Sequence, residues 1–303
     1  MYRLKLVKEN TTVDFMAIHK LSIALSIGMA VLSIVLMFTR GLNFGIDFTG
    51  GLLMEVKTPA AVHIAEVRHT LENLSAGTPT IQEFGDSAIM IKIPGKEADQ
   101  ATQKQLYEEV KTLLGSDVEY RRVEYVGPQV GKELIMVGIK AFVYSMLGIL
   151  AYMWFRFEWQ FGLATVVALA HDVFATLLFF AITQYEFDLS TVAAVLLVAG
   201  YSINDTVIVF DRIREMLIKH RKMPLDQVFN LSINQTLPRT IMTSMTTFLV
   251  MLVLLIFGAE AIKGFTYAML IGIIVGTYSS IFVAAPSLLY LGLRRIRSAE
   301  ATA

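Results

Sequence analysis

The sequence predicts an α-helical membrane protein with six transmembrane helices and one small α+β domain outside the bilayer. Three observations lead to this prediction. The chain of 303 residues is 55% hydrophobic and only 17% charged, whereas soluble proteins carry roughly a quarter charged residues. Six apolar segments are long enough to cross a hydrocarbon layer of about 30 Å. One polar segment of domain size, residues 40–133, separates the first apolar segment from the second.

The composition also excludes several kinds of function. The formal net charge is zero, so nothing draws the whole chain toward nucleic acid. The chain has no cysteine, which excludes disulfides, thiolate metal sites and cysteine nucleophiles. The sequence has no GxxxxGK loop followed by Ser or Thr, which would bind phosphate. We therefore expect no ATP use, no cofactor and no enzymatic activity.

The six predicted spans account for most of the remaining chain. The first apolar run is too long, and follows too much polar sequence, to be a cleaved signal peptide, so we expect it to remain as an anchor. Between an N-terminal segment, 1–20, and a tail, 294–303, we place the spans at residues 21–39, 134–155, 159–183, 189–210, 238–257 and 264–293.

Positive charges predict the orientation of these spans. Lys and Arg gather on the N-terminal segment, on the connection after the fourth span and on the tail, whereas the connection QYEFD after the third span has only acids. Cation-rich connections stay on the cytoplasmic side. We therefore expect a bacterial inner-membrane protein with both termini in the cytoplasm and residues 40–133 in the periplasm.

The periplasmic segment has a clear order of elements. Strand-like runs occur at 52–57, 80–84, 88–93 and 118–126, and helix-like runs at 58–74 and 97–114. Thr58 and Pro59 suit a helix start, and residues 85–87 suit a hairpin turn. The order β-α-β-β-α-β predicts a ferredoxin-like sandwich. His63 and His69 are six residues apart and have no evident third ligand, so we interpret them as solvated side chains rather than a metal site.

The connection between the fourth and fifth spans, residues 211–237, is charged at first and then amphipathic. Leu225, Val228, Phe229 and Ser232 follow helical spacing after Pro224. We expect this cytoplasmic loop to lie along the membrane surface or on the floor of the helix bundle.

Asp205 is the most unusual residue of the spans, because an ionised Asp at the centre of a membrane helix costs about 2.5–3.5 kcal/mol on insertion scales. No other charged side chain occurs between Leu189 and Asp205. Three spans carry a stripe of polar side chains along one helical face, and these side chains can find hydrogen-bond partners in the membrane only if they face the interior of the bundle. We therefore expect them to be the neighbours of Asp205. These stripes contain His171 and Asp172 on the third span, Asn204 on the fourth, and Arg239, Thr243 and Thr247 on the fifth.

Two interpretations of these residues remain open. In the first they form a proton relay, in which the carboxylate exchanges a proton and Arg239, which cannot release its own, is a movable counter-ion. In the second, Asp205 and Arg239 are a static buried ion pair that fixes the helix register, and His171 is a hydrogen-bonded core residue.

The sixth span carries small residues at four-residue spacing, which lets helix backbones approach closely. They are Gly272, Gly276 and Ser280. We interpret this stripe as helix packing and not as a ligand site.

Five motifs along the chain resemble the SecD/SecF family of bacterial protein-export subunits, and in particular its SecF members. They are GIDFTGG (45–51), VEYVGPQVGKEL (123–134), ALAHD (168–172), GYSINDTVIVFDRIRE (200–215) and RTIMTSMTT (239–247). The resemblance covers nearly the whole chain, in order. It implies one six-helix half of the fold of the resistance-nodulation-division (RND) superfamily, related to a partner half, SecD, by a pseudo-two-fold axis.

The resemblance also implies a function. It implies a heterodimer with SecD that uses the proton-motive force to promote preprotein translocation through SecYEG, with YajC and YidC as further candidate partners. The family Asp and Arg linked to proton conduction match Asp205 and Arg239. Protons would be the only coupling ion. The other expected contacts are unfolded preproteins on the periplasmic side and membrane lipid, and not nucleic acid.

One position departs from the family pattern, because Arg239 follows Pro238, where the family more often has another residue. Either the fifth span starts here, which would place Arg239 near the cytoplasmic interface, or the helix begins earlier, from about Gln227, and bends.

Two other functions remain as alternatives. A structural scaffold of the translocon would use its buried charges only to fix helix register, without proton coupling. An independent small-molecule exporter of the same superfamily would need larger periplasmic domains than residues 40–133 provide.

Overall fold

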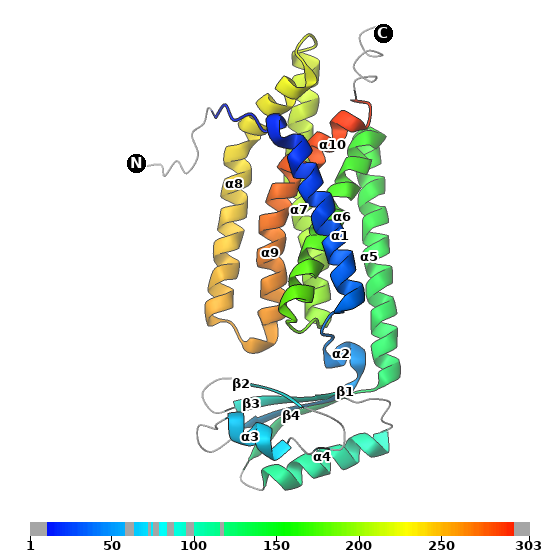
Figure 1. The fold of residues 1–303 in the computed structure, drawn as a ribbon, viewed down its shortest axis with the longest axis vertical. Helices are drawn as coiled ribbons and strands as arrows, with labels where there is room; N and C mark the ends of the chain where they lie inside the picture. The colour runs from blue at the N-terminus through cyan, green and yellow to red at the C-terminus, as the bar shows by residue number, and fades with distance from the viewer. Residues whose placement is uncertain are drawn as a thin grey trace, which may run out of the picture.

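The computed structural model describes residues 11–57, 64–71, 74, 79–83, 88–94, 100–115 and 118–293. Six helices within these ranges are long and apolar enough to cross a membrane. They form a bundle, and a small α+β domain lies at one end of it, which we call the domain end (Figure 1). The described residues nearest to the two chain ends both lie at the opposite, far end (Figure 1). The predicted fold class is confirmed.

The bundle has a buried centre and an exposed periphery. In chain order the helices are α1 (His19–Thr39), α5 (Pro128–Arg156), α6 (Trp159–Thr183), α7 (Leu189–Lys219), α8 (Leu225–Phe257), and α9 (Lys263–Ser279), which continues through a π-helical turn (Ser280–Ala284) into α10 (Ala285–Tyr290). The most buried spans, which form the centre, are α6, α7 and α9 with α10. Helices α5 and α8 lie on the outside, and few or none of the residues in their apolar segments are buried. Short 3-10 turns, Met16–Ile18 and Glu260–Ile262, precede α1 and α9.

The structure differs from the predicted loop at residues 211–237. Helix α7 continues to Lys219 and α8 begins at Leu225, so only a short turn joins them. The amphipathic pattern after Pro224 is the first part of α8, and its Val228 and Phe229 are buried in the same apolar cluster as Phe210 and Ile213 of α7. Because this cluster continues past the apolar spans, both helices are longer than their hydrophobic segments.

Pro238 lies inside α8, as in the second alternative for the start of this span. A proline leaves the carbonyl four residues earlier without its helical donor. That carbonyl belongs to Asn234, and the Thr11 hydroxyl lies 3.4 Å from it. The Asn234 side chain also accepts from the Val13 N–H at 3.0 Å and donates to the Val13 carbonyl at 2.8 Å. The segment before α1 therefore supports α8 where proline interrupts its hydrogen bonding.

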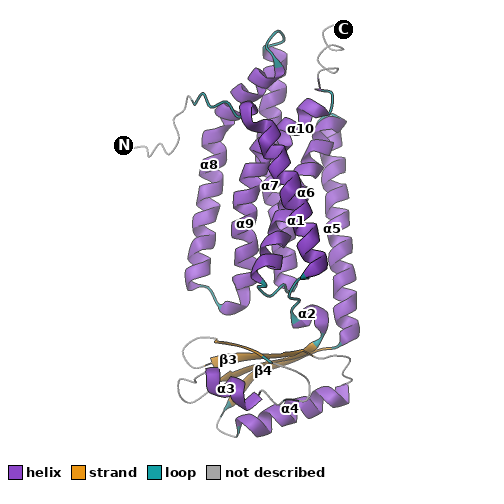
Figure 2. Cartoon of the chain, viewed as in Figure 1, coloured by secondary structure: helices purple, strands orange, loops and turns teal. Residues whose placement is uncertain are grey.

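The α+β domain has the predicted ferredoxin-like arrangement. Its antiparallel sheet has the order β2-β3-β1-β4, formed by β1 (Gly51–Lys57), β2 (Thr80–Glu83), β3 (Ala88–Pro94) and β4 (Glu119–Val126). Helices α3 (Ile64–Leu71) and α4 (Gln100–Leu114) cover the face that points away from the bundle (Figure 2). Alternate residues of β1, such as Leu52 and Met54, form the core beneath them.

Several predicted features of this domain lie outside the described residues. They are Thr58, Pro59, His63 and the turn at 85–87. His69 is exposed, and no group of three metal-binding side chains occurs in the described part of the chain.

The junction between the domain and the bundle is formed by the segment that contains α2 (Ile46–Thr49). The Gly45 N–H donates to the Phe187 carbonyl at 2.9 Å. The Asp47 carboxylate accepts from the Leu189 N–H at the start of α7, also at 2.9 Å. Gly50 has a φ of 74°, which only glycine adopts readily. The small domain is thereby attached to the connection between α6 and α7.

Candidate functional site

The buried polar side chains of the bundle gather between α6, α7, α8 and α9. Two carboxyl groups lie among them, Asp205 on α7 and Asp172 on α6, with exposed fractions of 2% and 0%. Burying a polar group is unfavourable unless it is hydrogen-bonded. The partners of these two carboxyl groups therefore define what the site can do.

Asp205 contacts hydroxyl groups of α8. The Thr243 hydroxyl lies 3.4 Å from its Oδ1, and the Ser244 hydroxyl lies 3.2 Å from its Oδ2. Ser244 is in turn 2.7 Å from the Thr277 hydroxyl of α9. This centre thus links three helices through groups that can both donate and accept a hydrogen bond.

Arg239 does not form the predicted ion pair. In the described part of the chain, the ion pairs within 4.0 Å do not include Arg239 or Asp205. The Arg239 side chain is exposed. On α8 it lies one turn before Thr243, whose hydroxyl is 3.1 Å from the Arg239 carbonyl.

Asp172 has a more complete set of partners. Its Oδ2 accepts from the Ser202 hydroxyl at 2.5 Å and from the Ser279 hydroxyl at 2.9 Å. Its Oδ1 lies 3.0 Å from Nδ1 of His171. The His171 ring stacks on Tyr278, with the ring centroids 5.8 Å apart. Three helices therefore meet at this carboxyl group.

The small residues of α9 bring these hydroxyls into place. A Cβ added to Gly272 would lie 2.2 Å from Val198 Cγ2, and one added to Gly276 would lie 3.0 Å from Ser202 Cβ. Helix α9 therefore lies directly against α7, in the close approach that small residues permit. The Ser280 hydroxyl reaches Thr206 of α7 at 2.9 Å.

The structure places the predicted site residues in two groups. It brings Thr243 to Asp205 and His171 to Asp172. It leaves Asn204 exposed, and Thr247 donates to the Thr243 carbonyl at 3.1 Å instead of facing a carboxyl group.

The hydroxyl groups of Ser202, Ser244, Thr277 and Ser279 belong to the site but were not among the predicted site residues. Of these four residues, Ser244 and Thr277 adjoin residues that were singled out, Thr243 and Gly276. A neighbour in the sequence points about 100° away on a helix, so only the packing of α8 against α7 and α9 selects them.

Exposed polar residues and an exposed glycine also occur on the surface of α7 and α8, beside exposed apolar residues such as Leu197 and Met242. Gly200 and Asn204 are exposed four residues apart on α7, and Arg239 and Thr246 are exposed seven residues apart on α8. Each pair lies on one face of its helix. Charged and polar groups are costly in contact with lipid, so these two exposed stripes are typical of helices that pack against a further protein.

Two family models match the chain. Residues 106–294 match the model described as protein export membrane protein SecD/SecF, C-terminal. Residues 35–58 match the SecD/SecF GG motif, which includes the glycines at the junction of the domain and the bundle.

Curated relatives match over nearly their whole length. The chain is 44% identical over 304 residues to the protein translocase subunit SecF of Cereibacter sphaeroides, covering 97% of this chain and 94% of the relative. It is 42% identical over 299 residues to the protein translocase subunit SecF of Rickettsia felis, covering 97% of each.

Solved structures share the fold. The crystal structure of SecDF, a translocon-associated membrane protein from Thermus thermophilus, matches with a TM-score of 0.82 and 34% identity over 94% of this chain. SecDF in a super-membrane-facing form matches with a TM-score of 0.72 and 33% identity over 97% of this chain. The chain spans only 39% and 40% of the length of those two chains.

Proposed function

The chain belongs to the SecD/SecF family of protein-export membrane proteins, and we propose that it pairs with SecD and couples the proton-motive force to preprotein translocation. It is a multi-pass membrane protein, and its curated relatives are translocase subunits. The coupling ion, the partner and the orientation in the membrane are the parts of this proposal that need support.

The observation that carries proton coupling is the environment of Asp205. Its carboxyl group is buried inside a membrane span and hydrogen-bonded to Thr243 and Ser244, with no cation at ion-pair distance in the described residues. A hydroxyl group can donate a hydrogen bond to a charged carboxylate and can accept one from a neutral carboxyl group. A charged Asp205 would then be stabilised by approach of the Arg239 guanidinium, which always keeps its proton. Proton release and movement of Arg239 are thereby coupled.

Asp172 provides a second exchanging group in this proposal. Ser202, which donates to Asp172, lies one turn before Asp205 on α7. Hydroxyls and His171 can pass protons between donor and acceptor positions. The relay therefore consists of Asp205 and Ser202 on α7, of Arg239, Thr243 and Ser244 on α8, and of Asp172 and His171 on α6. It needs no cofactor and no covalent reaction.

The exposed stripes support a SecD partner. Arg239 and Asn204 lie on faces of α7 and α8 that this chain leaves uncovered, and polar groups at such positions require protein neighbours. The SecDF structures are more than twice as long as this chain, so their remaining part corresponds to the SecD half in our proposal. Contacts with SecYEG, YajC and YidC belong to the same proposal.

The distribution of Lys and Arg supports the orientation. Both termini and the turn after α7 would lie in the cytoplasm, and the α+β domain would lie in the periplasm of an inner membrane. Preproteins would then emerge on the side of the α+β domain, and protons entering from that side would reach Asp205 in the cytoplasmic half of α7.

The test is Asp205→Asn in a strain that lacks the native copy, with SecD co-expressed. Asn keeps the size and the hydrogen bonds but cannot exchange a proton. We expect normal assembly of the complex and loss of the export that depends on the proton gradient. Asp211→Asn is the matched control, because Asp211 is an exposed carboxylate on the same helix.

Two outcomes would contradict the proposal. Export that keeps its full response to the proton gradient in Asp205→Asn would leave only the scaffold function. Export that depends on a sodium gradient instead would show that the coupling ion is Na⁺, bound by the carboxylate and hydroxyl oxygens of this site.

A charge exchange separates the relay from the scaffold. The double variant Asp205→Arg, Arg239→Asp should remain inactive, because the two groups do not pair in this structure. Recovery of activity in the double variant, relative to each single variant, would favour a static ion pair.

A further inference from the structure

We propose that the chain binds a phospholipid at the domain end of the bundle, with an acyl chain in an apolar cavity and the phosphate held by Arg40 and Lys132. The proposal does not depend on proton coupling. It rests on the composition of the cavity, on the direction of its opening and on the two cations beside it.

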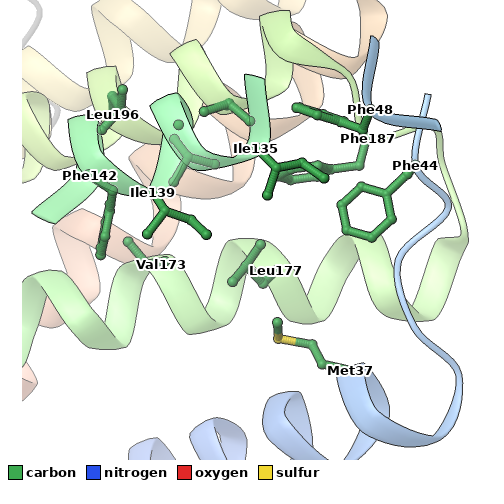
Figure 3. Close-up of a pocket in the computed structure, with 13 residues that line it drawn as sticks. Met37, Phe44, Phe48, Ile135, Ile139, Phe142, Val173, Leu177, Phe187 and Leu196 are labelled. Atoms are coloured by element: carbon green, nitrogen blue, oxygen red, sulfur yellow. The ribbon is translucent and has the colours of Figure 1, made fainter. Parts of the chain in front are cut away.

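The cavity has a volume of about 380 Å³ and is lined by 13 residues from α1, α5, α6, α7, the connection between α6 and α7, and the junction segment (Figure 3). Every lining residue is apolar or glycine. Met37, Ile139, Phe142 and Leu177 are among the walls shown in Figure 3. Such a surface offers no hydrogen bond, so a sugar, a peptide backbone or a polar metabolite would lose its hydration there without compensation.

The opening faces the bilayer. Ile135 and Ile139 on α5 are 37% and 54% exposed, and Phe44 on the junction segment is 44% exposed. These three residues line the cavity, and Ile135 and Ile139 lie on a helix that is long and apolar enough to span a membrane. An occupant therefore enters from the hydrocarbon layer.

Two cations lie just beyond the walls, toward the domain end. Lys132 precedes Ile135, Ile139 and Phe142 by 3, 7 and 10 positions on α5, which places all four on one helical face. Arg40 follows Met37 by one turn at the end of α1. Both cations are exposed, and neither forms an ion pair within the described residues.

Within the described residues, the Arg40 side chain donates one hydrogen bond and keeps its other donors. Its Nη1 donates to the Ile182 carbonyl at 2.9 Å, which holds the side chain at the end of α6, five residues after the cavity residue Leu177. The remaining guanidinium N–H groups match the geometry of a phosphate. A lipid phosphate lies at the boundary between hydrocarbon and headgroups. Arg40 directly follows the apolar span 16–39, and Lys132 lies in the first turn of the apolar span 130–156, so we infer that both cations lie at this boundary.

The volume of the cavity favours an acyl chain over a partner helix as its occupant. One turn of helix with its side chains is a cylinder about 10 Å wide and 5.4 Å high, or roughly 400 Å³. The cavity would hold at most one such turn, whereas a membrane helix has several. An acyl chain is far narrower and needs no hydrogen bonds.

The experiment is native mass spectrometry of the full chain in its complex, with phosphatidylglycerol as the probe. The variant Arg40→Gln, Lys132→Gln should bind it about tenfold more weakly, because charge-assisted bonds to the phosphate are lost. Lys140→Gln is the control, since Lys140 is an exposed cation on the same helix. Undiminished binding by the double variant would overturn the proposal.

A second variant tests the cavity itself. Ile139→Trp should fill it and displace the lipid, whereas Leu147→Trp, at an exposed position of the same helix, should not. Dioleoylglycerol, which has acyl chains but no phosphate, should bind about tenfold more weakly than phosphatidylglycerol to the unaltered chain. Equal binding of the two lipids would contradict the phosphate site. A photoreactive side chain at Ile139 that captures a protein instead of lipid would overturn the acyl-chain site.

Discussion

At the scale of single residues, the two buried carboxyl groups differ in how completely they are hydrogen-bonded. Asp172 receives two serine hydroxyls and the His171 ring. Asp205 has two longer contacts, and the Arg239 charge is nearby but unpaired. The first arrangement is that of a structural centre. The second arrangement would let Asp205 exchange its hydrogen-bond partners at low cost.

Removal of the Asp172 carboxyl should therefore destabilise the protein. Asp172→Ala leaves the Ser202 and Ser279 hydroxyls buried without their acceptor, at a cost of about 1–3 kcal/mol for each group that finds no new partner. Thermal unfolding in detergent measures this loss. Ser279→Ala, which removes only one hydroxyl, should cost less. An equal effect of the two variants would contradict the assigned hydrogen bonds.

Arg239 should behave in the opposite way. Because it forms no ion pair here, Arg239→Gln should change the unfolding free energy by no more than about 0.5 kcal/mol. The same variant should lose the export that depends on the proton gradient, since Gln cannot neutralise a charged Asp205. Unfolding and export are measured on the same preparation. A large loss of stability would show that Arg239 is part of a structural pair.

At the scale of the elements, the contact between α7 and α9 organises the site. Because Gly272 and Gly276 have no side chains, the backbone of α9 packs directly against Val198 and Ser202 of α7. This approach carries Ser279 to Asp172 and Ser280 to Thr206. The packing stripe and the polar site are thus two consequences of one helix contact.

A methyl group at Gly272 should separate these helices. Gly272→Ala places Cβ within 2.2 Å of Val198, and overpacking of this kind costs typically 1–3 kcal/mol. Val198→Ala in the same chain should recover part of the loss. Gly148→Ala is the control, because nothing lies within 4 Å of a Cβ there. The double-mutant cycle is measured by thermal unfolding, and additive effects would contradict the contact.

At the scale of the whole molecule, the α+β domain is attached to the bundle through few residues. Lys92 of β3 forms an ion pair of 2.6 Å with Glu186 in the connection between α6 and α7, and both side chains are largely buried. Glu186 also lies against Gly45 of the junction segment. Since α7 carries Asp205, the domain and the helix of this buried carboxyl group share the same connection.

Loss of the Lys92 charge should loosen the junction. Lys92→Met leaves Glu186 largely buried without its partner, which is more harmful than removing both charges together. We expect faster amide exchange in residues 42–51 for Lys92→Met than for Lys92→Met, Glu186→Leu. Arg122→Met is the control, because its ion pair with Glu124 is exposed and worth little. Equal exchange in all three variants would contradict a junction held by this pair.

Length, composition and hydrophobic periodicity determined the six spans, the order of the small domain and the presence of Asp205 and Asp172 in the interior. These properties follow from local sequence, because the bilayer thickness and the helix and strand repeats act on each segment separately. The tertiary structure decided the continuity of α8 through Pro238, the exposure of Asn204 and Arg239, and the roles of Ser244 and Thr277. Each depends on which face of one helix meets another, and that choice is made by the packing of residues far apart in the chain, such as Gly272 against Val198 and Thr11 beside Asn234.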